Sequence, residues 1–183
     1  MTPTLFQRLM GAEFYHLADE VKALHSHRGV FRYHGECTVE RGRNPLGRMA
    51  SLVLRFPRAM RDAPISIEFD AQGAQEIWRR SFNGTPMRSR LRFDGGFLQD
   101  KTGPARFRFR LYRIGKDLHW VLEHAKVFGV FPLPERWLEG VRCREYAQDG
   151  RYHFDVQARM PIFGLLLAYS GWLEAEACAD VPT

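Results

Sequence analysis

The sequence predicts a mainly β fold: an antiparallel barrel or half-barrel of about ten strands with two helical segments. The first observation is alternation, clearest in Ala105–Ile114, where three apolar residues alternate with arginines. Successive side chains of a strand point to opposite faces, so this segment has one apolar and one cationic face. The second observation is that similar segments recur along the chain, separated by turns too short for the crossovers that parallel strands need.

Two helical segments precede most of the strands. Apolar residues spaced three and four apart in Glu13–His25 predict an N-terminal helix with one apolar side. The first strand is predicted at Val30–Arg41, with a kink at Gly35. Pro45 then marks a helix start, and an apolar helical pattern continues to Phe56, where a proline follows. We therefore expect a helical insertion directly after strand one.

The remaining strands follow from residue 64 onward. Gly, Asn and Asp residues at the breaks between them supply tight-turn geometry. These strands are predicted at Ile65–Asp70, Ala74–Phe82, Met87–Phe93, Phe97–Lys101, Ala105–Ile114, Leu118–Phe128, Val141–Gln148, Tyr152–Met160 and Leu165–Ala175. A strongly twisted sheet of about ten strands tends to curl or close, which protects its edges. The proline-rich segment Pro132–Leu138 interrupts the series and predicts a corner, with one helical turn, that caps an open end.

Length and composition indicate one domain in a reducing compartment. We find no linker, internal repeat or low-complexity tract, so residues 1–183 are expected to form a single domain. Cys37, Cys143 and Cys178 form no CxxC pair and are too few for a disulfide framework. The N-terminal residues lack the pattern of an export signal, and no apolar stretch reaches the roughly 20 residues of a membrane-spanning helix. We expect a cytoplasmic protein without a membrane span.

The net charge of +6 comes almost entirely from arginine. An acidic partner, nucleic acid or anionic lipid would fit this charge. The alternative, which we favour, places the arginines on the outer face of the sheet, solvated and paired with Glu and Asp. The arginine rows of Met87–Phe93 and Ala105–Ile114 carry few aromatic residues on their polar faces for bases to stack on. We therefore expect no nucleic-acid binding.

Several motifs occur in an order that resembles a known family. They are Val39–Gly42, Trp78–Phe82, Gly103–Phe107, Gly129–Pro134, Asp149–Val156, Pro161–Gly164 and Tyr169–Leu173. Their order and spacing resemble the bacterial family called domain of unknown function 4166, over nearly the whole chain. The resemblance implies no activity. It implies a partner, because members resemble a domain found alone or fused to a saccharopine-dehydrogenase-like, NAD(P)-binding oxidoreductase.

No cofactor is expected on this chain itself. A nicotinamide-binding domain carries GxGxxG directly after a first strand, and the sequence has no such motif. A GxSxG nucleophile elbow and a GxxxxGK[ST] phosphate loop are also missing. Cys37 and Cys143 alternate onto apolar strand faces, where a thiol is usually inert. His25 and His27 lack neighbours at zinc spacing, so we expect no metal site and assign His25 to a structural hydrogen bond.

An arginine on an apolar strand face is the main ligand-binding candidate. Arg80 shares its face with Trp78, and an arginine among aromatic rings in a small barrel can hold a carboxylate or phosphate while the rings cover an apolar tail. Arg41 and Arg106 lie in the family-like motifs and are further candidates. The alternative is that Arg80 lies outside and pairs with Glu68 on an adjacent strand.

Tyr169 is the last ligand-binding candidate. It lies in the apolar final strand, three positions before Trp172, so the two rings face opposite sides of the sheet. We expect Tyr169 to line the cavity and Trp172 to act as a structural plug.

Glu145 and His124 are candidates for acid–base catalysis. Glu145 alternates with Val141 and Cys143 on an apolar face, and His124 shares a face with Trp120 on another strand. Desolvation raises the pKa of a carboxyl group, and an adjacent imidazole would complete a proton-transfer couple. The alternative is that Glu145 pairs with an inward arginine, or that its strand face is assigned wrongly.

The expected layout resembles lipocalin-type and fatty-acid-binding barrels, in which a helical lid after strand one covers the mouth. We therefore expect non-covalent binding of a small apolar or amphipathic molecule. Two alternatives stay open: an enzyme that uses Glu145 and a histidine, and an interaction module that docks onto an NAD(P)-dependent oxidoreductase. A binding protein requires an apolar cavity, and an enzyme requires an imidazole within hydrogen-bond distance of Glu145.

Overall fold

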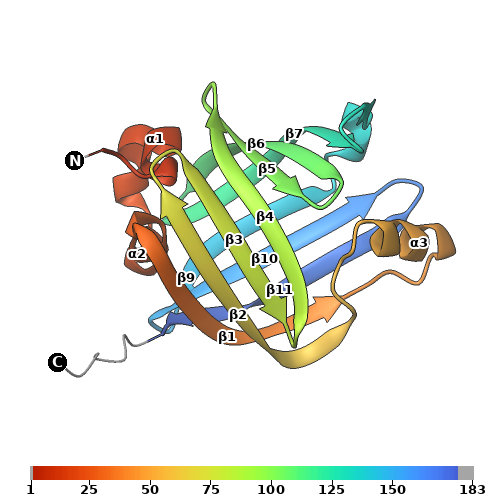
Figure 1. Ribbon diagram of the computed structural model, residues 1–183, viewed down its shortest axis with the longest axis horizontal. Coiled ribbons are helices and arrows are strands. Elements are labelled where there is room, and N and C mark those ends of the chain that lie inside the picture. Colours follow the sequence, from red (N-terminus) through yellow and green to blue (C-terminus); the bar gives the residue numbers. More distant parts are fainter. Residues whose placement is uncertain (1, 177–183) are drawn as a thin grey trace.

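Ten antiparallel strands close into a barrel in the computed structural model, which describes residues 2–176 (Figure 1). The barrel strands are β1 (Gly29–Glu40), β2 (Met60–Gln72), β3 (Gln75–Phe82), β4 (Thr85–Asp94), β5 (Phe97–Thr102), β6 (Ala105–Ile114), β7 (Asp117–Val127), β9 (Val141–Gln148), β10 (Arg151–Met160) and β11 (Gly164–Ala175). Consecutive strands pair along most of the sheet. The pairing of β1 with β11 and of β7 with both β6 and β9 completes the circle. The predicted barrel and its ten strands are confirmed.

The alternation of buried and exposed side chains is clearest in β3. Glu76, Trp78, Arg80 and Phe82 are buried, and the residues between them are exposed or half-buried. The outer faces carry charge, as expected: on neighbouring strands, the Glu68 carboxylate accepts hydrogen bonds from the guanidinium groups of Arg32 and Arg79. Exposed pairs of this kind contribute at most about 1 kcal/mol each. The sheet therefore separates an apolar interior from a charged exterior.

Two glycines allow β1 and β11 to lie close together where the barrel closes. A Cβ on Gly35 would lie 1.9 Å from the carbonyl oxygen of Trp172, and one on Gly171 would lie 2.1 Å from that of Glu36. Real Cβ atoms do not approach backbone oxygens this closely, so glycine is required at both positions. At Gly35, where a kink was predicted, β1 runs unbroken and its backbone approaches that of β11 closely.

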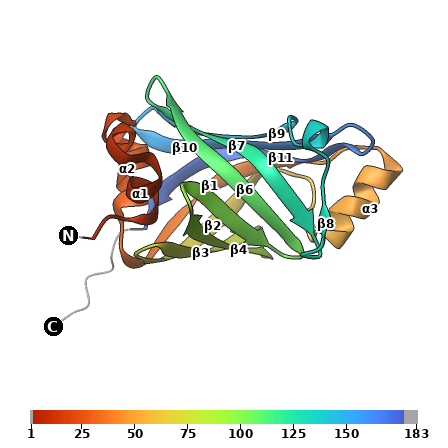
Figure 2. The same ribbon diagram turned by 90° about the horizontal axis from the view of Figure 1, so that it is seen from above.

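The N-terminal segment forms three short helices instead of the single helix expected over Glu13–His25. They are α1 (Leu5–Met10), the 3₁₀ helix η1 (Gly11–His16) and α2 (Asp19–Ser26). The chain is extended at Leu17, and the backbone N–H of Ala18 donates to the carbonyl of Lys116 in the β6–β7 turn. This bond to the barrel interrupts the helix. The three helices cover one end of the barrel with buried apolar side chains (Figure 2).

The predicted helical insertion is confirmed as α3 (Pro45–Val53), at the opposite end of the barrel (Figures 1 and 2). Asn44 caps it: its side chain accepts from the backbone N–H of Leu46 and donates to the carbonyl of Ile162. The Ser51 hydroxyl lies 2.9 Å from the carbonyl of Leu166, to which it donates. These bonds fix α3 to the start of β11.

The corner after β7 also forms as expected. It contains the two-residue strand β8 (Phe131–Pro132), which pairs with the end of β7, and the single turn η2 (Glu135–Trp137).

In the part of the chain that the structure describes, no helix is long and apolar enough to cross a bilayer. Cys178 lies outside the described residues.

Candidate ligand-binding site

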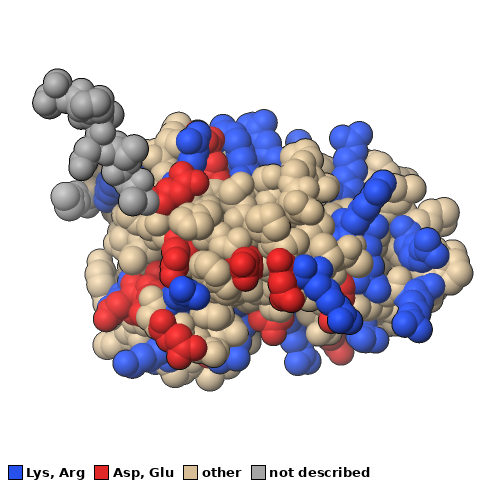
Figure 3. Space-filling model, turned by 90° about the horizontal axis from the view of Figure 1, so that it is seen from below, with Lys and Arg blue, Asp and Glu red and all other residues tan. Residues whose placement is uncertain are grey.

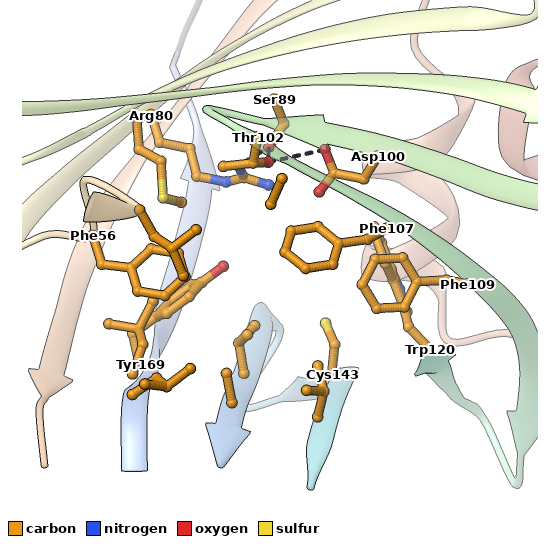
Figure 4. A pocket seen from close by; sticks show the side chains of 18 of the residues that line it. Phe56, Arg80, Ser89, Asp100, Thr102, Phe107, Phe109, Trp120, Cys143 and Tyr169 are labelled. Atoms are coloured by element: carbon orange, nitrogen blue, oxygen red, sulfur yellow. Dashed lines mark hydrogen bonds between the residues drawn. The ribbon is translucent and has the colours of Figure 1, made fainter. Parts of the chain in front are cut away.

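A cavity of about 400 Å³ lies inside the barrel. Most of its lining is apolar, and Figure 4 shows the rings of Phe56, Phe107, Phe109, Trp120 and Tyr169 around it. The corner after β7 contributes further lining residues, so it covers part of the cavity, as predicted. Pockets for small molecules typically enclose about 300–1,000 Å³. The barrel interior therefore has room for a small apolar molecule.

One wall of this cavity carries a chain of polar side chains from three adjacent strands (Figure 4). The Arg80 guanidinium on β3 donates to the hydroxyl of Ser89 on β4, at 2.8 Å. The Ser89 and Thr102 hydroxyls share a hydrogen bond of 2.7 Å, and Thr102 donates to the carboxylate of Asp100 at 3.0 Å. Thr102 and Asp100 both lie on β5, so the four polar side chains come from three neighbouring strands. We call these four residues the polar wall.

Arg80 is the cation of the polar wall, and only 9% of its surface is exposed. Its guanidinium lies 4.8 Å from the ring centre of Trp78. Within residues 2–176, no carboxylate oxygen lies within 4 Å of it. A guanidinium has five N–H donors, and a single side-chain acceptor in the described structure, Ser89, uses one of them. Arg80 thus has donors left for an anion that enters the cavity.

Asp100 compensates the positive charge of Arg80 only weakly. Burial raises the pKa of its carboxyl group, while the Arg80 charge and the hydrogen bond from Thr102 oppose that rise. Because burial dominates, the negative form of Asp100 is less favoured than that of a solvated aspartate. The positive charge of Arg80 is correspondingly more available to a bound anion.

Three of the five predicted ligand-binding residues line the cavity. They are Arg80, Trp78 and Tyr169. Trp172 lies on the opposite face from Tyr169, as expected, and the Arg151 guanidinium lies 4.3 Å from the centre of its ring. Arg80 therefore faces inward, and its alternative partner on the outer face, Glu68, pairs with other arginines.

The structure does not bring Arg41 or Arg106 to the cavity. Arg106 is exposed because it alternates with the inward residue Ala105. The Arg41 guanidinium donates to the backbone carbonyls of Ser51 and Phe56, so it holds the end of α3. Burial, together with the charge of Arg58, lowers the pKa of Arg41.

Glu145 points inward, as its alternation predicted, but its partner is His25 and not His124. The His25 Nε2 and Glu145 Oε2 atoms lie 2.6 Å apart, and both side chains are almost fully buried. His124 is exposed, so placing it on an inward face was wrong. The cause is a β-bulge: opposite Arg108 and Phe109, β7 has one extra residue between Leu122 and His124.

The His25–Glu145 pair belongs to a buried polar cluster beneath the N-terminal helices. The ring of Phe6 stacks on His25 with centroids 3.6 Å apart, and Trp78 Nε1 donates to the Glu76 carboxylate at 2.8 Å. Burial raises the pKa of Glu76, and the charge of Glu145 adds to this effect, while His25 and Trp78 act against it. Glu145 also faces the cavity. Glu76 was not among the predicted site residues, although it alternates in phase with Trp78 and Arg80.

The raised pKa of Glu76 predicts how stability depends on pH. The folded protein holds this proton to a higher pH than the unfolded chain, so the free energy of unfolding falls as pH rises from about 4.3, the unfolded value. Replacing Glu76 with Gln keeps an acceptor for Trp78 and removes the titration. We expect Glu76→Gln to be more stable than the wild type at neutral pH, with the difference shrinking toward pH 4.

Urea denaturation at a series of pH values measures this effect, and Glu68→Gln is the matched control. The arginines that pair with Glu68 lower the pKa of its carboxyl group, so its stabilisation is present above the unfolded pKa and is lost on acidification. The two variants should therefore shift stability in opposite directions at neutral pH. A Glu76→Gln variant less stable than the wild type at neutral pH would contradict the expectation.

Burial also determines the chemistry of the two thiols that the structure describes. It raises the pKa of Cys37 to about 11, and it raises the pKa of Cys143 well above its ordinary value, with a further contribution from the charge of Glu145. Cys143 lines the cavity. A thiol that stays protonated is a poor nucleophile, in agreement with the expected inertness of both residues.

Comparison with known proteins places the chain in a family. The family model described as domain of unknown function (DUF4166) matches residues 17–173. No curated protein matches the sequence. Among solved structures, the crystal structure of Rv2717c from M. tuberculosis is similar at 13% sequence identity, with a TM-score of 0.44, over 88% of this chain and 99% of that one. Because the family model covers most of its length, the chain belongs to the DUF4166 family, as its motifs predicted.

Proposed function

We propose that the protein binds a small amphipathic anion, with the apolar part of the ligand in the cavity and its acidic group on Arg80. The observation that carries this proposal is a buried arginine, with no carboxylate oxygen within ion-pair distance in the described structure, in a mostly apolar cavity. A buried charge is unfavourable unless it is paired and hydrogen-bonded. A carboxylate or phosphate on the ligand would supply that partner, and a guanidinium binds such groups through two parallel hydrogen bonds.

The apolar lining of the cavity would contact the rest of the ligand, its apolar tail. Each Å² of apolar surface that leaves water contributes about 25 cal/mol, so an aliphatic or aromatic tail would supply most of the affinity. The polar wall then selects the end of the ligand that faces it.

We propose that the chain is a single domain that works in the cytoplasm. As the family resemblance suggests, it would present its ligand to a saccharopine-dehydrogenase-like oxidoreductase.

A first experiment compares native and denatured mass spectra of protein purified without detergent. We expect a reproducible extra mass in the native spectrum, from a retained amphipathic molecule. A titration then uses tryptophan fluorescence, because Trp78, Trp120 and Trp137 line the cavity. Dodecanoate should bind, dodecanol should bind more weakly because it lacks the charge, and acetate should not bind because it lacks the tail.

Two results would contradict the proposal. If dodecanol binds as tightly as dodecanoate, Arg80 does not hold an acidic group. If the native spectrum shows the bare chain and neither long-chain compound binds, the cavity does not serve amphipathic ligands.

A second candidate function is acid–base catalysis by Glu145. The observation that favours it is the 2.6 Å hydrogen bond to His25, made by a carboxyl group that also lines the cavity. An imidazole at this distance can exchange a proton with a carboxyl group. If Glu145 is catalytic, Glu145→Gln should abolish turnover of the bound molecule without weakening its binding. Recovery of that molecule chemically unchanged after incubation would exclude catalysis.

A further inference from the structure

The α3 end of the barrel exposes most of the large apolar side chains on the described surface. Four of them lie on α3, three in residues 128–131 and one in the turn before β11. Leu52 and Val130 are 74% and 70% exposed. Figure 2 places α3 and β8 at the same end, away from the N-terminal helices. Soluble proteins rarely group exposed apolar side chains in this way unless the surface binds something.

The same end is basic. Residues 41–61 contain six arginines and no acidic residue, and five of these arginines are exposed. None of the six forms an ion pair within the described structure, whereas several arginines on the barrel wall, such as Arg32 and Arg144, pair with carboxylates. Figure 3 shows blue side chains gathered at the right-hand end, which is the α3 end in Figure 1. The surface thus combines an apolar tip with unpaired positive charge.

The cavity also reaches this end. Its lining includes Leu46, Met49 and Val53 of α3, and no residue of α1, η1 or α2. These three side chains are partly exposed as well, so α3 lies between the cavity and solvent. A ligand that enters or leaves the barrel past α3 would therefore cross the apolar, basic surface.

We infer that the α3 end docks onto an anionic lipid bilayer. An amphipathic helix with apolar residues on one side and arginines around it lies in the membrane interface, where acidic headgroups attract the arginines. A second copy of the chain fits less well, because a symmetric interface would bring the same unpaired arginines together. Docking would place the cavity against the phase in which amphipathic molecules dissolve. The inference goes beyond ligand binding and does not require a bound ligand.

Vesicle flotation tests the inference. Wild-type protein should bind phosphatidylcholine vesicles that contain phosphatidylglycerol, bind pure phosphatidylcholine much more weakly, and dissociate as salt is raised. Leu52→Glu should reduce binding to the anionic vesicles at least about tenfold, because it removes apolar contact and adds a negative charge. Arg48→Glu should reduce it by about fivefold or more, the effect expected for one basic residue at the surface.

Matched controls place the same changes elsewhere on the barrel. Ile114 is 55% exposed at the end of β6, next to the turn that contacts the N-terminal helices, and Arg90 is exposed on the barrel wall. Ile114→Glu and Arg90→Glu should leave vesicle binding unchanged. Leu52 does not line the cavity, so Leu52→Glu should keep the dodecanoate affinity of the wild type. Vesicle binding and ligand binding can therefore fail separately.

Three outcomes would overturn the inference. The first is equal binding of the wild type to neutral and anionic vesicles, or no binding to either. The second is an equal loss of binding in Leu52→Glu and Ile114→Glu. The third is self-association of the wild type in sedimentation that Leu52→Glu abolishes while vesicle binding persists, which would assign the surface to a second copy of the chain.

Discussion

Replacing Arg80 with Met is expected to weaken dodecanoate binding by roughly 10²-fold and to change dodecanol binding little. Hydrogen bonds to a charged group contribute about 1.5–3 kcal/mol, and a two-pronged guanidinium–carboxylate pair is among the stronger of these interactions. Met keeps an apolar stem of similar length, and Ser89 keeps its hydrogen bond to Thr102. The loss therefore falls on the charged group of the ligand and not on its tail.

The measurement is a tryptophan fluorescence titration of each variant with both compounds. Arg106→Met is the matched control, because Arg106 lies on the outer face of the barrel and should keep wild-type affinity. Arg80→Lys should fall between the wild type and Arg80→Met, since lysine keeps the charge and loses the planar pair of donors. Equal dodecanoate affinities of Arg80→Met and Arg106→Met would show that Arg80 does not bind the acidic group.

Replacing His25 with Ala is expected to lower the free energy of unfolding by about 3–5 kcal/mol, because it opens a cavity in the core and leaves a buried hydrogen-bond partner unsatisfied. Glu145 is 2% exposed, so its carboxyl group would lose its hydrogen bond to His25 at a site shielded from bulk solvent. Phe6 would also lose the ring that stacks on it. For a protein of this length, such a loss lowers the melting temperature by on the order of 10 °C.

Urea denaturation followed by circular dichroism measures this loss. The exposed pair Arg110–Glu123 is the control, and Arg110→Ala should cost less than about 1 kcal/mol. The double variant His25→Leu with Glu145→Leu should recover part of the stability, because it removes both members of the buried pair together. If His25→Ala costs no more than Arg110→Ala, the buried pair does not support the fold.

Most of the barrel could be predicted because the strands follow a two-residue period between turns that are marked by glycine. Trp78 and Arg80 are an example: the two-residue period placed both on one face of their strand, and the structure shows that this face lines the cavity. The period fails at a bulge, which depends on the pairing partner as well as on the strand's own sequence. In β7 the bulge turns His124 outward and places Ala125 inside.

The polar wall shows what the sequence left undetected. Asp100 alternates in phase with Leu98, a signal that could have identified it as an inward carboxyl group. The sequence pattern does not identify Ser89 and Thr102 in this way, because small hydroxyl side chains are common on either face of a strand. The break of the N-terminal helix at Leu17 could not be predicted either, since it depends on a hydrogen bond to the distant β6–β7 turn.

The seam between β1 and β11 determines when the cavity comes into existence. It pairs Cys37 with Gly171, residues from opposite ends of the chain, and such distant contacts form late because they require the closure of a long loop. Until β9 to β11 have been synthesised the barrel cannot close, so any sheet that the earlier strands form would leave its apolar face in water. The newly made chain therefore cannot hold a ligand, and its exposed interior is open to aggregation or chaperone binding until the last strand joins the first.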